Sequence, residues 1–383
     1  MKRILFLMLL LLFLMVVAVS CQSGETETSA VTTTFSTNDT TAATSEGDGQ
    51  LTTEAITTEA ITTEAVTTAA NTTVGEVTEA DTTYPDTEYD TSSIEQSKSE
   101  PLLIRWDPYR LSPIFEEEDA YREGAEAIIK AILDYCPTAT FSSEEVMDAV
   151  LANLFYEFPP SALCTFVTDG ETLTVCISYR LERSEHLAAL SAFGERIETL
   201  VADTLLYGDD EATMALLLYH EISRSVDYFS VNYDTWQTNA YYALMQGKSI
   251  CYGFADAFNY LLRQVGMEAY LVKSYRASDR AAHSWSLVKI DGDYYHCDPT
   301  WESSAFSGEG FVYFGYTDTR RGSTMSLKDA TIGEGALQKN LSFSATSTRF
   351  DGMNGARITS GEWTLDREQR AIVFKFKKYP YGK

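Results

Sequence analysis

Apolar residues recur with regular spacing only in the part of the chain after residue 100. Before that, an unbroken apolar run at residues 4–17 is followed by a long polar stretch. Later in the chain, apolar residues return every three to four positions in several segments, which predicts amphipathic helices. These segments are residues 117–135, 142–155, 187–205, 211–228, 239–244 and 251–265.

Shorter segments are rich in β-branched and aromatic residues and are bounded by turn residues, which predicts strands. They are residues 163–167, 173–179, 269–275, 284–290 and 293–297, with β-leaning segments at 311–316, 337–344, 363–365 and 371–376. Asp291-Gly292 joins two of the strands and is a strong hairpin signal. We therefore expect an α+β protein that contains antiparallel hairpins.

The N-terminus has the features of a secretion signal. Lys2 and Arg3 precede the apolar run, and small residues around Cys21 end it. This ending resembles the lipobox of bacterial lipoproteins, in which the cysteine is acylated. We expect residues 1–21 to be a lipoprotein signal peptide, with Cys21 lipidated on the extracytoplasmic face of the cell membrane. A plain signal peptide or a membrane-spanning helix is the alternative, although the run is short for a span.

Residues 22–100 are dominated by Thr, Ser, Glu, Ala and Asp, and the pentad Thr-Thr-Glu-Ala-Ile occurs at 52–56 and again at 57–61. The segment has 16 acidic residues and one basic residue, Lys98. Such a composition cannot bury enough apolar surface to offset the entropy lost on ordering. We expect a disordered stalk between the membrane and the folded part of the chain.

The net charge of the chain is −27, and the part after residue 100 is also acidic. This balance argues against nucleic acid or an anionic lipid surface as a partner. We expect a small α+β domain at residues 101–205, in which no group of residues suggests chemistry and His186 lies at the surface. A second domain is expected at residues 206–383, with a β-rich C-terminal extension.

Cys164 and Cys176 flank a predicted turn at residues 168–171. A three-residue loop would set the two cysteines opposite each other and allow a cross-strand disulfide. A two-residue loop would put them on opposite faces and exclude it. The sequence leaves both alternatives open.

Cys251 lies at the start of the predicted helix 251–265. The unpaired amides and the dipole of a helix start favour a thiolate and can also stabilise an oxyanion. Because Gly253 has no side chain, a substrate backbone could approach the first turn of the helix closely. A buried structural cysteine is the alternative reading.

The hairpin that follows carries the remaining candidate residues. A two-residue turn at 291–292 fixes a register in which His283 and Asp298 are diagonal neighbours on one face. A hydrogen bond between them would orient the imidazole and fix its tautomer. Cys297 points to the opposite face and is expected in the core, whereas His296 shares the Asp298 face and is expected to form a wall. The alternative is a metal site formed by Cys251, His283 and Asp298, but the sequence lacks the residue spacings that are typical of zinc motifs.

Three segments together resemble the motif blocks of the transglutaminase-like superfamily. They read Gly247-Lys-Ser-Ile-Cys-Tyr-Gly-Phe-Ala, His283-Ser-Trp and Asp298-Pro-Thr-Trp301. The resemblance covers roughly residues 206–320, and its three blocks agree in order and spacing. It implies a papain-like core in which a helix carrying the cysteine packs on an antiparallel sheet carrying the histidine and the aspartate.

The resemblance also implies roles for individual residues. Cys251 is the implied nucleophile, His283 the base and acid, and Asp298 the residue that orients the histidine. Three further residues of the same motifs are expected to contribute to substrate binding or to the oxyanion site, namely Gly253, Tyr252 and Trp285. Upstream candidates for the oxyanion donor are Trp236, Gln237 and Asn239.

The implied function is that of a surface-anchored thiol enzyme that attacks peptide or cell-wall amide bonds through a thioester. Water as the acceptor would make it a peptidase or amidase, and a lysine amine would make it a cross-linking enzyme; we expect hydrolysis. A non-catalytic surface binding or scaffolding module that reuses the fold is the alternative. The expected partners are a peptide or protein substrate and the membrane, with no metal or cofactor and no nucleic acid.

Overall fold

The computed structural model describes residues 100–115, 118–229, 238–306, 310–355, 363–374 and 377–382. All of these residues belong to one compact unit. The predicted signal, the Cys21 lipidation site and the stalk up to residue 99 lie outside the described residues. Within the described part of the chain, no helix is both long and apolar enough to cross a bilayer.

Residues 101–206 form helices beside a small antiparallel sheet of order β1-β3-β2. The predicted helices and the predicted hairpin are confirmed, and the short strand β1 is an addition. The start of α3 agrees with the sequence, since the Ser143 side chain accepts a hydrogen bond from the Val146 amide at 3.2 Å. The elements are η2 (Pro113–Phe115), α2 (Asp119–Leu133), β1 (Thr138–Thr140), α3 (Glu144–Glu157), η3 (Pro159–Leu163), β2 (Cys164–Asp169), β3 (Thr174–Tyr179) and α4 (Arg183–Thr204).

The β2–β3 hairpin excludes the disulfide that one loop length would have allowed. Asp169 pairs with Thr174, so the loop has four residues, and Cys164 lies opposite Tyr179 and not opposite Cys176. The offset places the two cysteines on opposite faces. Cys164 is buried, Cys176 is exposed, and both are free thiols.

The prediction for His186 is wrong, because this histidine is fully buried. Its Nε2 lies 3.0 Å from the Ile132 carbonyl oxygen. Its ring packs edge-on against the rings of Tyr135 and Tyr179. Burial lowers the pKa of His186. It is a packing residue that joins α4 to α2 and β3.

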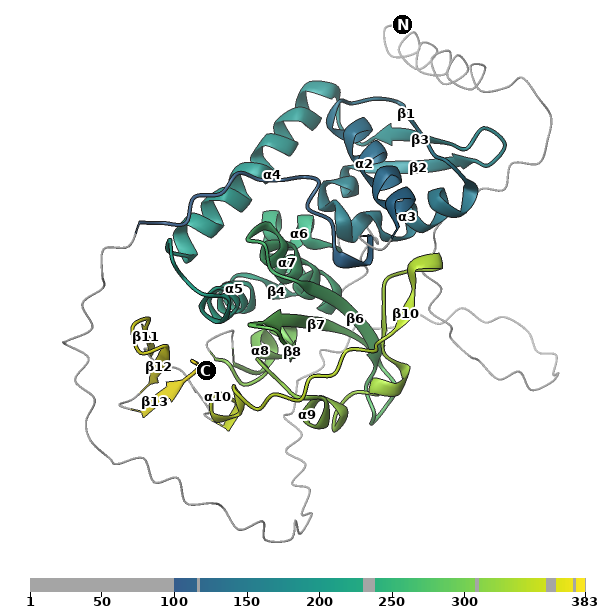
Figure 1. Ribbon diagram of the computed structural model, residues 1–383. Coiled ribbons are helices and arrows are strands. Elements are labelled where there is room, and N and C mark those ends of the chain that lie inside the picture. The colour runs from purple at the N-terminus through teal and green to yellow at the C-terminus, as the bar shows by residue number, and fades with distance from the viewer. Residues whose placement is uncertain are drawn as a thin grey trace, which may run out of the picture. The chain divides into compact units, whose positions relative to one another are not determined.

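The central part of the chain follows the predicted order of helices and strands. The helix α7 packs against β6 and β7 of a five-stranded sheet of order β10-β9-β6-β7-β8 (Figure 1). The helix α8 was not predicted. The elements are α5 (Glu211–Ser225), β4 (Asp227–Tyr228), α6 (Ala240–Gln246), β5 (Lys248–Ser249), α7 (Cys251–Gln264), β6 (Ala269–Tyr275), β7 (Ala282–Ile290), β8 (Asp293–Cys297) and α8 (Pro299–Phe306).

The C-terminal part is less strand-rich than the sequence suggests. Residues 311–316 form turns with one isolated bridge from Tyr316 to His296, so the strand expected there is wrong. Of the segment 337–344, only β10 (Lys339–Asn340) is a strand. The later expectations are confirmed by the strands β11 and β12. The elements are α9 (Asp318–Gly322), η5 (Leu327–Asp329), β9 (Thr331–Ile332), η6 (Gly335–Leu337), β10, α10 (Asp351–Gly355), β11 (Trp363–Asp366), β12 (Ala371–Phe374) and β13 (Lys377–Pro380).

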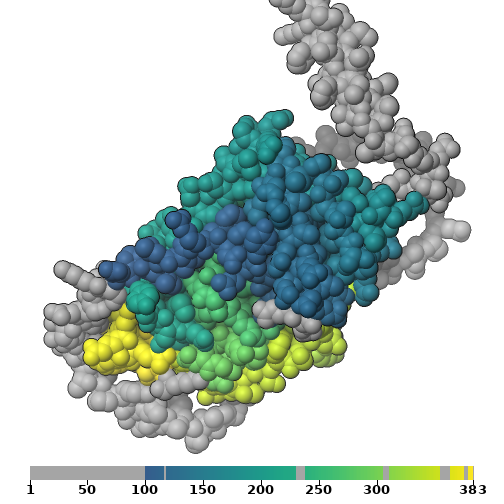
Figure 2. Space-filling model, turned by 45° about the horizontal axis from the view of Figure 1, so that its top comes forward, coloured from purple at the N-terminus to yellow at the C-terminus, as the bar shows by residue number. Residues whose placement is uncertain are grey.

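Two hydrophobic clusters hold these elements together. The first joins α4, α5, α6 and α7 to one face of the sheet. The second covers the other face, where Val272, Trp285 and Leu287 meet apolar residues of α2 and α3. In Figure 2 the blue and teal elements of residues 101–206 lie directly against the green central elements. The Trp106 indole donates to the Tyr260 hydroxyl at 2.7 Å across this boundary. The domain boundary at 205/206 stays a prediction.

Candidate active site

The helix α7 presents Cys251 at its first position, as predicted. The first turn of an α-helix leaves its amide groups without intrahelical partners. Phe254 is the first residue to bond back, from its amide to the Ile250 carbonyl at 3.2 Å. At the other end, Gly266 has a φ of 86° and its neighbour Met267 donates to Leu262 at 2.9 Å, which closes the helix in a Schellman motif. Cys251 itself is half-buried.

The β7–β8 hairpin has the predicted register. Asp291 and Gly292 both have positive φ, 49° and 92°, which is the backbone of a two-residue type I′ turn. The two strands pair from Ile290 with Asp293 to Ser286 with Cys297. This register puts His283 and Asp298 just beyond the last pair, on a common face.

The predicted contact between these two residues is present in the structure. The His283 Nε2 donates to Asp298 Oδ2 at 2.7 Å. Cys251 also acts on His283, since it raises the pKa of the imidazole. Because Nε2 is used by Asp298, Nδ1 is the ring nitrogen left to face the Cys251 sulfur. His283 therefore interacts with Asp298 through a hydrogen bond and with Cys251 electrostatically.

Burial alone would lower the pKa of His283. The Asp298 carboxylate and Cys251 outweigh burial and raise that pKa to about 9. An imidazolium at neutral pH favours a thiolate beside it. His283 can therefore be an imidazolium at neutral pH before a substrate arrives.

The carboxylate of Asp298 is held at both oxygens. Besides His283, Oδ2 accepts a hydrogen bond from Arg321 Nη2 at 2.8 Å, and Oδ1 accepts the Trp301 amide at 3.1 Å. Burial would raise the pKa of Asp298, but the charges of His283 and Arg321 lower it below its usual range. Asp298 therefore stays ionised although only 1% of its surface is exposed.

The main chain of Asp298 is fixed by residues from other elements. Its amide donates to the Tyr313 carbonyl at 2.9 Å, and its carbonyl accepts the Tyr219 hydroxyl at 3.1 Å. The oxygen of the same hydroxyl lies 2.9 Å from Glu302 Oε2 on α8. Burial raises the pKa of Glu302 to about 7, against the opposing effect of the Tyr313 amide.

Arg321 and Trp301 complete the surroundings of the histidine. The guanidinium carbon of Arg321 lies 4.3 Å from the Trp285 ring centroid and 4.6 Å from that of Trp301. The Trp301 ring stacks on His283 at a centroid distance of 5.1 Å. The sequence analysis assigned no role to Arg321. It lies 23 residues after Asp298, on the short helix α9, and no periodicity or motif marks it.

Trp285 does not fit the role of a substrate-binding residue. It is fully buried, and its indole N–H donates to His296 Nδ1 at 2.9 Å. His296 is also buried and is not a wall of the site; its Nε2 then carries the proton and donates to Asp318 at 3.0 Å. Cys297 lies in the core, as predicted, and burial raises its pKa to about 12.

Gly253 is required by the chain's own packing. A Cβ at this position would lie 2.6 Å from the Thr238 carbonyl oxygen and would overlap the Ser249 side chain. The expected approach of a substrate backbone at Gly253 stays a prediction. Tyr252 is half-buried, and its ring lies 4.6 Å from that of Tyr156.

Among the upstream candidates for an oxyanion donor, Trp236 and Gln237 lie outside the described residues. Asn239 caps α6, and its side-chain amide donates to the carbonyls of Phe155 and Pro159 at 3.3 and 2.8 Å. Its donors are thus used within the fold. The amides of the first turn of α7 remain the best-placed oxyanion donors in the described part of the chain.

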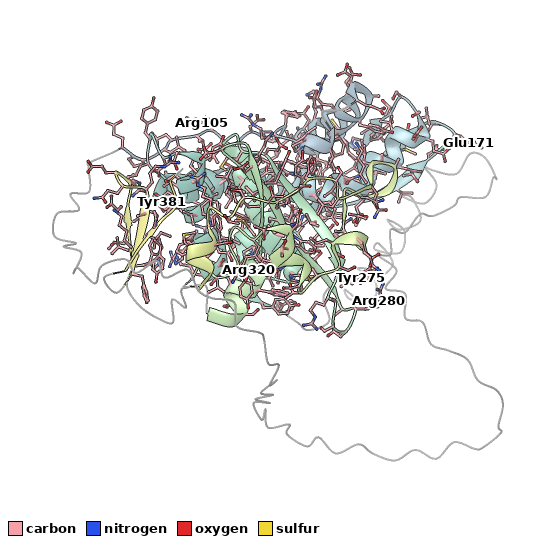
Figure 3. All side chains as sticks on the ribbon, turned by 60° about the horizontal axis from the view of Figure 1, so that its bottom comes forward. Arg105, Glu171, Tyr275, Arg280, Arg320 and Tyr381 are labelled. Atoms are coloured by element: carbon pink, nitrogen blue, oxygen red, sulfur yellow. The ribbon has the colours of Figure 1, made fainter. Side chains whose placement is uncertain are left out.

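A groove of about 490 Å³ opens beside the site. It lies between the tip of the β6–β7 hairpin, marked by Tyr275 and Arg280 in Figure 3, and the region of α9, marked by Arg320. Trp301, whose ring stacks on His283, forms part of its wall. Its lining residues are Arg276, Ser278, Trp301, Ser304, Tyr313, Ser323 and Thr324.

The family comparison agrees with this geometry. Residues 198–299 match the family model of the transglutaminase-like superfamily. The matched segment runs from the end of α4 to the start of α8 and includes Cys251, His283 and Asp298. The chain is an α+β protein in which a helix carrying the cysteine packs on an antiparallel sheet, as the sequence predicted, and residues 198–299 of it are similar to the transglutaminase-like superfamily.

The comparison with curated proteins found no sequence match. Among solved structures, the chain is similar to a candidate cysteine protease from Cytophaga hutchinsonii, with 18% identity and a TM-score of 0.24, over 29% of this chain and 37% of that one. It is also similar to a TGase, with 12% identity and a TM-score of 0.26 over 36% and 43% of the two chains.

Legionella pneumophila LapG has 12% identity and a TM-score of 0.22, over 32% of this chain and 67% of that one. The chain thus spans less than half the length of the first two structures.

Proposed function

We propose that this protein is a thiol hydrolase of the transglutaminase-like type, which cleaves amide bonds in peptides or in cell-wall peptide. The observation that carries the proposal is that His283 interacts with Cys251 and is hydrogen bonded to Asp298. A thiol, a base and a group that orients the base are the parts that covalent acyl transfer needs.

In the first half-reaction, the Cys251 thiolate attacks the carbonyl carbon of the amide. The amides at the start of α7 stabilise the oxyanion that develops. The carbon–nitrogen bond then breaks, and the His283 imidazolium gives its proton to the departing amine. The product is a thioester on Cys251 beside a neutral His283.

In the second half-reaction, an acceptor attacks the thioester. His283 Nδ1 takes a proton from the acceptor, the carbon–sulfur bond breaks, and the thiolate–imidazolium pair is restored. We propose water as the acceptor, because water needs no binding site of its own. A lysine amine would instead make the protein a cross-linking enzyme.

We further propose that the enzyme works at the cell surface. Lipidation at Cys21 would anchor it, and the acidic stalk would hold the folded part away from the membrane. The groove beside Trp301 suits a peptide, since it offers two aromatic rings and five hydroxyl groups. Hydroxyl groups and aromatic faces bind polar, partly apolar chains without requiring a single charge.

The first test is iodoacetamide labelling near neutral pH, followed by peptide mapping. Cys176 is an exposed free thiol in the same chain and serves as the internal reference. Cys251 is expected to react at least tenfold faster than Cys176, and His283→Gln should remove the difference. Equal rates for the two cysteines would end the proposal of an activated nucleophile.

The second test is mass spectrometry of the protein incubated with peptide libraries, with and without an added amine. Backbone cleavage supports a peptidase, whereas loss of ammonia with incorporation of the amine shows a transglutaminase. Cys251→Ala should abolish either product. If that variant keeps the full biological effect of the protein, a binding or scaffolding module is the better description.

A further inference from the structure

Arg321 is placed where a purely structural arginine would be costly. Its side chain is 1% exposed, and burying a guanidinium is unfavourable unless its charge is compensated. Asp298 is the residue that forms a salt bridge with it, through Nη2 and Oδ2 at 2.8 Å. The faces of Trp285 and Trp301 enclose the rest of the guanidinium at 4.3 and 4.6 Å.

One oxygen of Asp298 therefore accepts hydrogen bonds from two cationic side chains. Oδ2 accepts from His283 at 2.7 Å and from Arg321 at 2.8 Å. Before the reaction, the Asp298 carboxylate lies between two cations, the His283 imidazolium and the Arg321 guanidinium. In the thioester, the cysteine is uncharged and His283 has lost its proton. The carboxylate and the guanidinium then still balance each other.

The same buried aspartate without Arg321 would depend on His283 alone for its counter-charge. An uncompensated carboxylate in a buried site holds on to the nearest proton. His283 would then resist giving its proton to the leaving amine. It would also be a poor acceptor when water attacks the thioester, because it would already be protonated.

We propose that Arg321 is a positioning residue that balances Asp298 through the whole reaction, so that His283 can release and recover its proton. The proposal rests on the catalytic role proposed above for His283. Arg321 touches no reacting atom and acts through Asp298. Its place in the fold, on α9 and far from the three motif blocks in sequence, ties the C-terminal part of the chain to the site.

The other ionisable residues near Asp298 and Arg321 are the same in every variant of the test. Those around Asp298 and Arg321 are Tyr219 on α5, His296 and Cys297 on β8, Glu302 on α8, and Tyr313 and Tyr316 in the following loop. Cys251 on α7 faces His283 directly. Substitution of Cys251 removes the thiolate and leaves the balance between His283, Asp298 and Arg321 to be measured.

The test is an NMR titration of the full-length Cys251→Ala protein labelled in its histidine rings. The chain has four histidines, so the spectrum is simple, and His283→Gln assigns the signal. Arg321→Met and Arg321→Gln are each expected to raise the pKa of His283 by about one unit or more, because a nearby positive charge has been removed. Arg321→Lys keeps the positive charge and should change the pKa of His283 little.

Arg320→Met is the matched control, since it removes the same charge from the neighbouring position on α9. It should leave the His283 titration unchanged. An unchanged or lowered His283 pKa in both neutral Arg321 variants overturns the proposal. The titration does not require turnover, so it can succeed even if the protein cleaves no amide, and the two proposals fail separately.

If the neutral Arg321 variants are too unstable for the titration, a comparison of unfolding free energies decides whether Arg321 compensates the charge of Asp298. Arg321→Met leaves the Asp298 carboxylate buried without its arginine, whereas Asp298→Asn/Arg321→Met removes both charges together. The double variant is expected to be more stable than the single variant in urea unfolding. A double variant that is no more stable than Arg321→Met contradicts the compensating role.

Discussion

The indole of Trp301 stacks almost parallel to the imidazole of His283, with ring planes inclined by 18° and centroids 5.1 Å apart. His283 is therefore held by a hydrogen bond at its Nε2 edge and by a flat surface on its face. Together these contacts restrict both the tilt and the rotation of the ring.

We expect Trp301→Ala to lower kcat by about 10- to 100-fold, because a displacement of the base by about 1 Å has effects of this order. Trp301→Phe keeps a flat apolar face and should retain most of the activity. Amide hydrolysis and urea unfolding of both variants measure this. Equal losses of activity in the two variants would show that the stacking itself is not needed.

His283 makes stability depend on pH in the alkaline range. Its pKa is about 9 in the folded protein, against about 6.5 for an unperturbed histidine. The folded state binds the proton more tightly, so this contribution is complete below about pH 6.5 and is lost as pH rises through 9. It amounts to roughly 3 kcal/mol. The difference in unfolding free energy between wild type and His283→Gln should shrink over this range; a constant difference would contradict the shift.

Asp256 has the opposite effect on folding. It is buried on α7, where burial raises its pKa to about 8 although Arg263 opposes the shift. The folded state favours the protonated acid, so the cost of ionising it grows as pH rises from about 4 to 8.

Asp256→Asn keeps an oxygen that can accept the hydrogen bond from the Ala240 amide. We expect this variant to be more stable than wild type at pH 9, by a few kcal/mol, with the advantage fading towards pH 4. Chemical denaturation at several pH values provides the comparison. A variant that is less stable than wild type at pH 9 would show that the ionised carboxylate stabilises the fold.

Gly253→Ala is expected to destabilise the protein by about 3 kcal/mol or more, because the new Cβ would meet the Thr238 carbonyl and the Ser249 side chain. Gly352→Ala on α10 is the matched control, since no atom lies within 4 Å of a Cβ built there. Thermal unfolding of both proteins tests the prediction. If the two substitutions have equal effects, the close approach at Gly253 is not important for stability.

Cys164 and Cys176 should remain separate thiols under oxidising conditions, because the hairpin puts them on opposite faces. Alkylation of the folded protein should label Cys176 readily and Cys164 only after denaturation. Burial also raises the pKa of Cys164 to about 12, which suppresses its thiolate. Non-reducing peptide mapping after mild oxidation would reveal a 164–176 crosslink, and its presence would refute the register.

The sequence predicted the parts of the site that depend on local rules. The turn at Asp291-Gly292 fixes a register, and that register alone brought His283 beside Asp298 and directed Cys297 into the core. Cys251 was placed correctly because the apolar periodicity of the helix can be read from the sequence, although Ile250 at the N-cap supplies no capping side chain.

The remaining parts of the site come from contacts between segments that are distant in sequence. Arg321 reaches Asp298 from α9, and nothing in its immediate sequence signals a buried arginine. Trp285 looked available because it lies in a motif beside His283, but the neighbouring strand supplies a partner for its indole. His186 was misjudged for the same reason, since burial by α2 and β3 is a tertiary effect that a helix start does not reveal.

Asp298 lies at the junction where β8 ends and α8 begins, and its carboxylate accepts the Trp301 amide of the first turn. The group that aligns the histidine is thus also the cap of an eight-residue helix. A transient opening of α8 would release that cap and leave the histidine misaligned while the rest of the core stays folded. Catalytic competence should therefore follow the local opening equilibrium of α8, and on warming it should disappear before the cooperative unfolding of the protein.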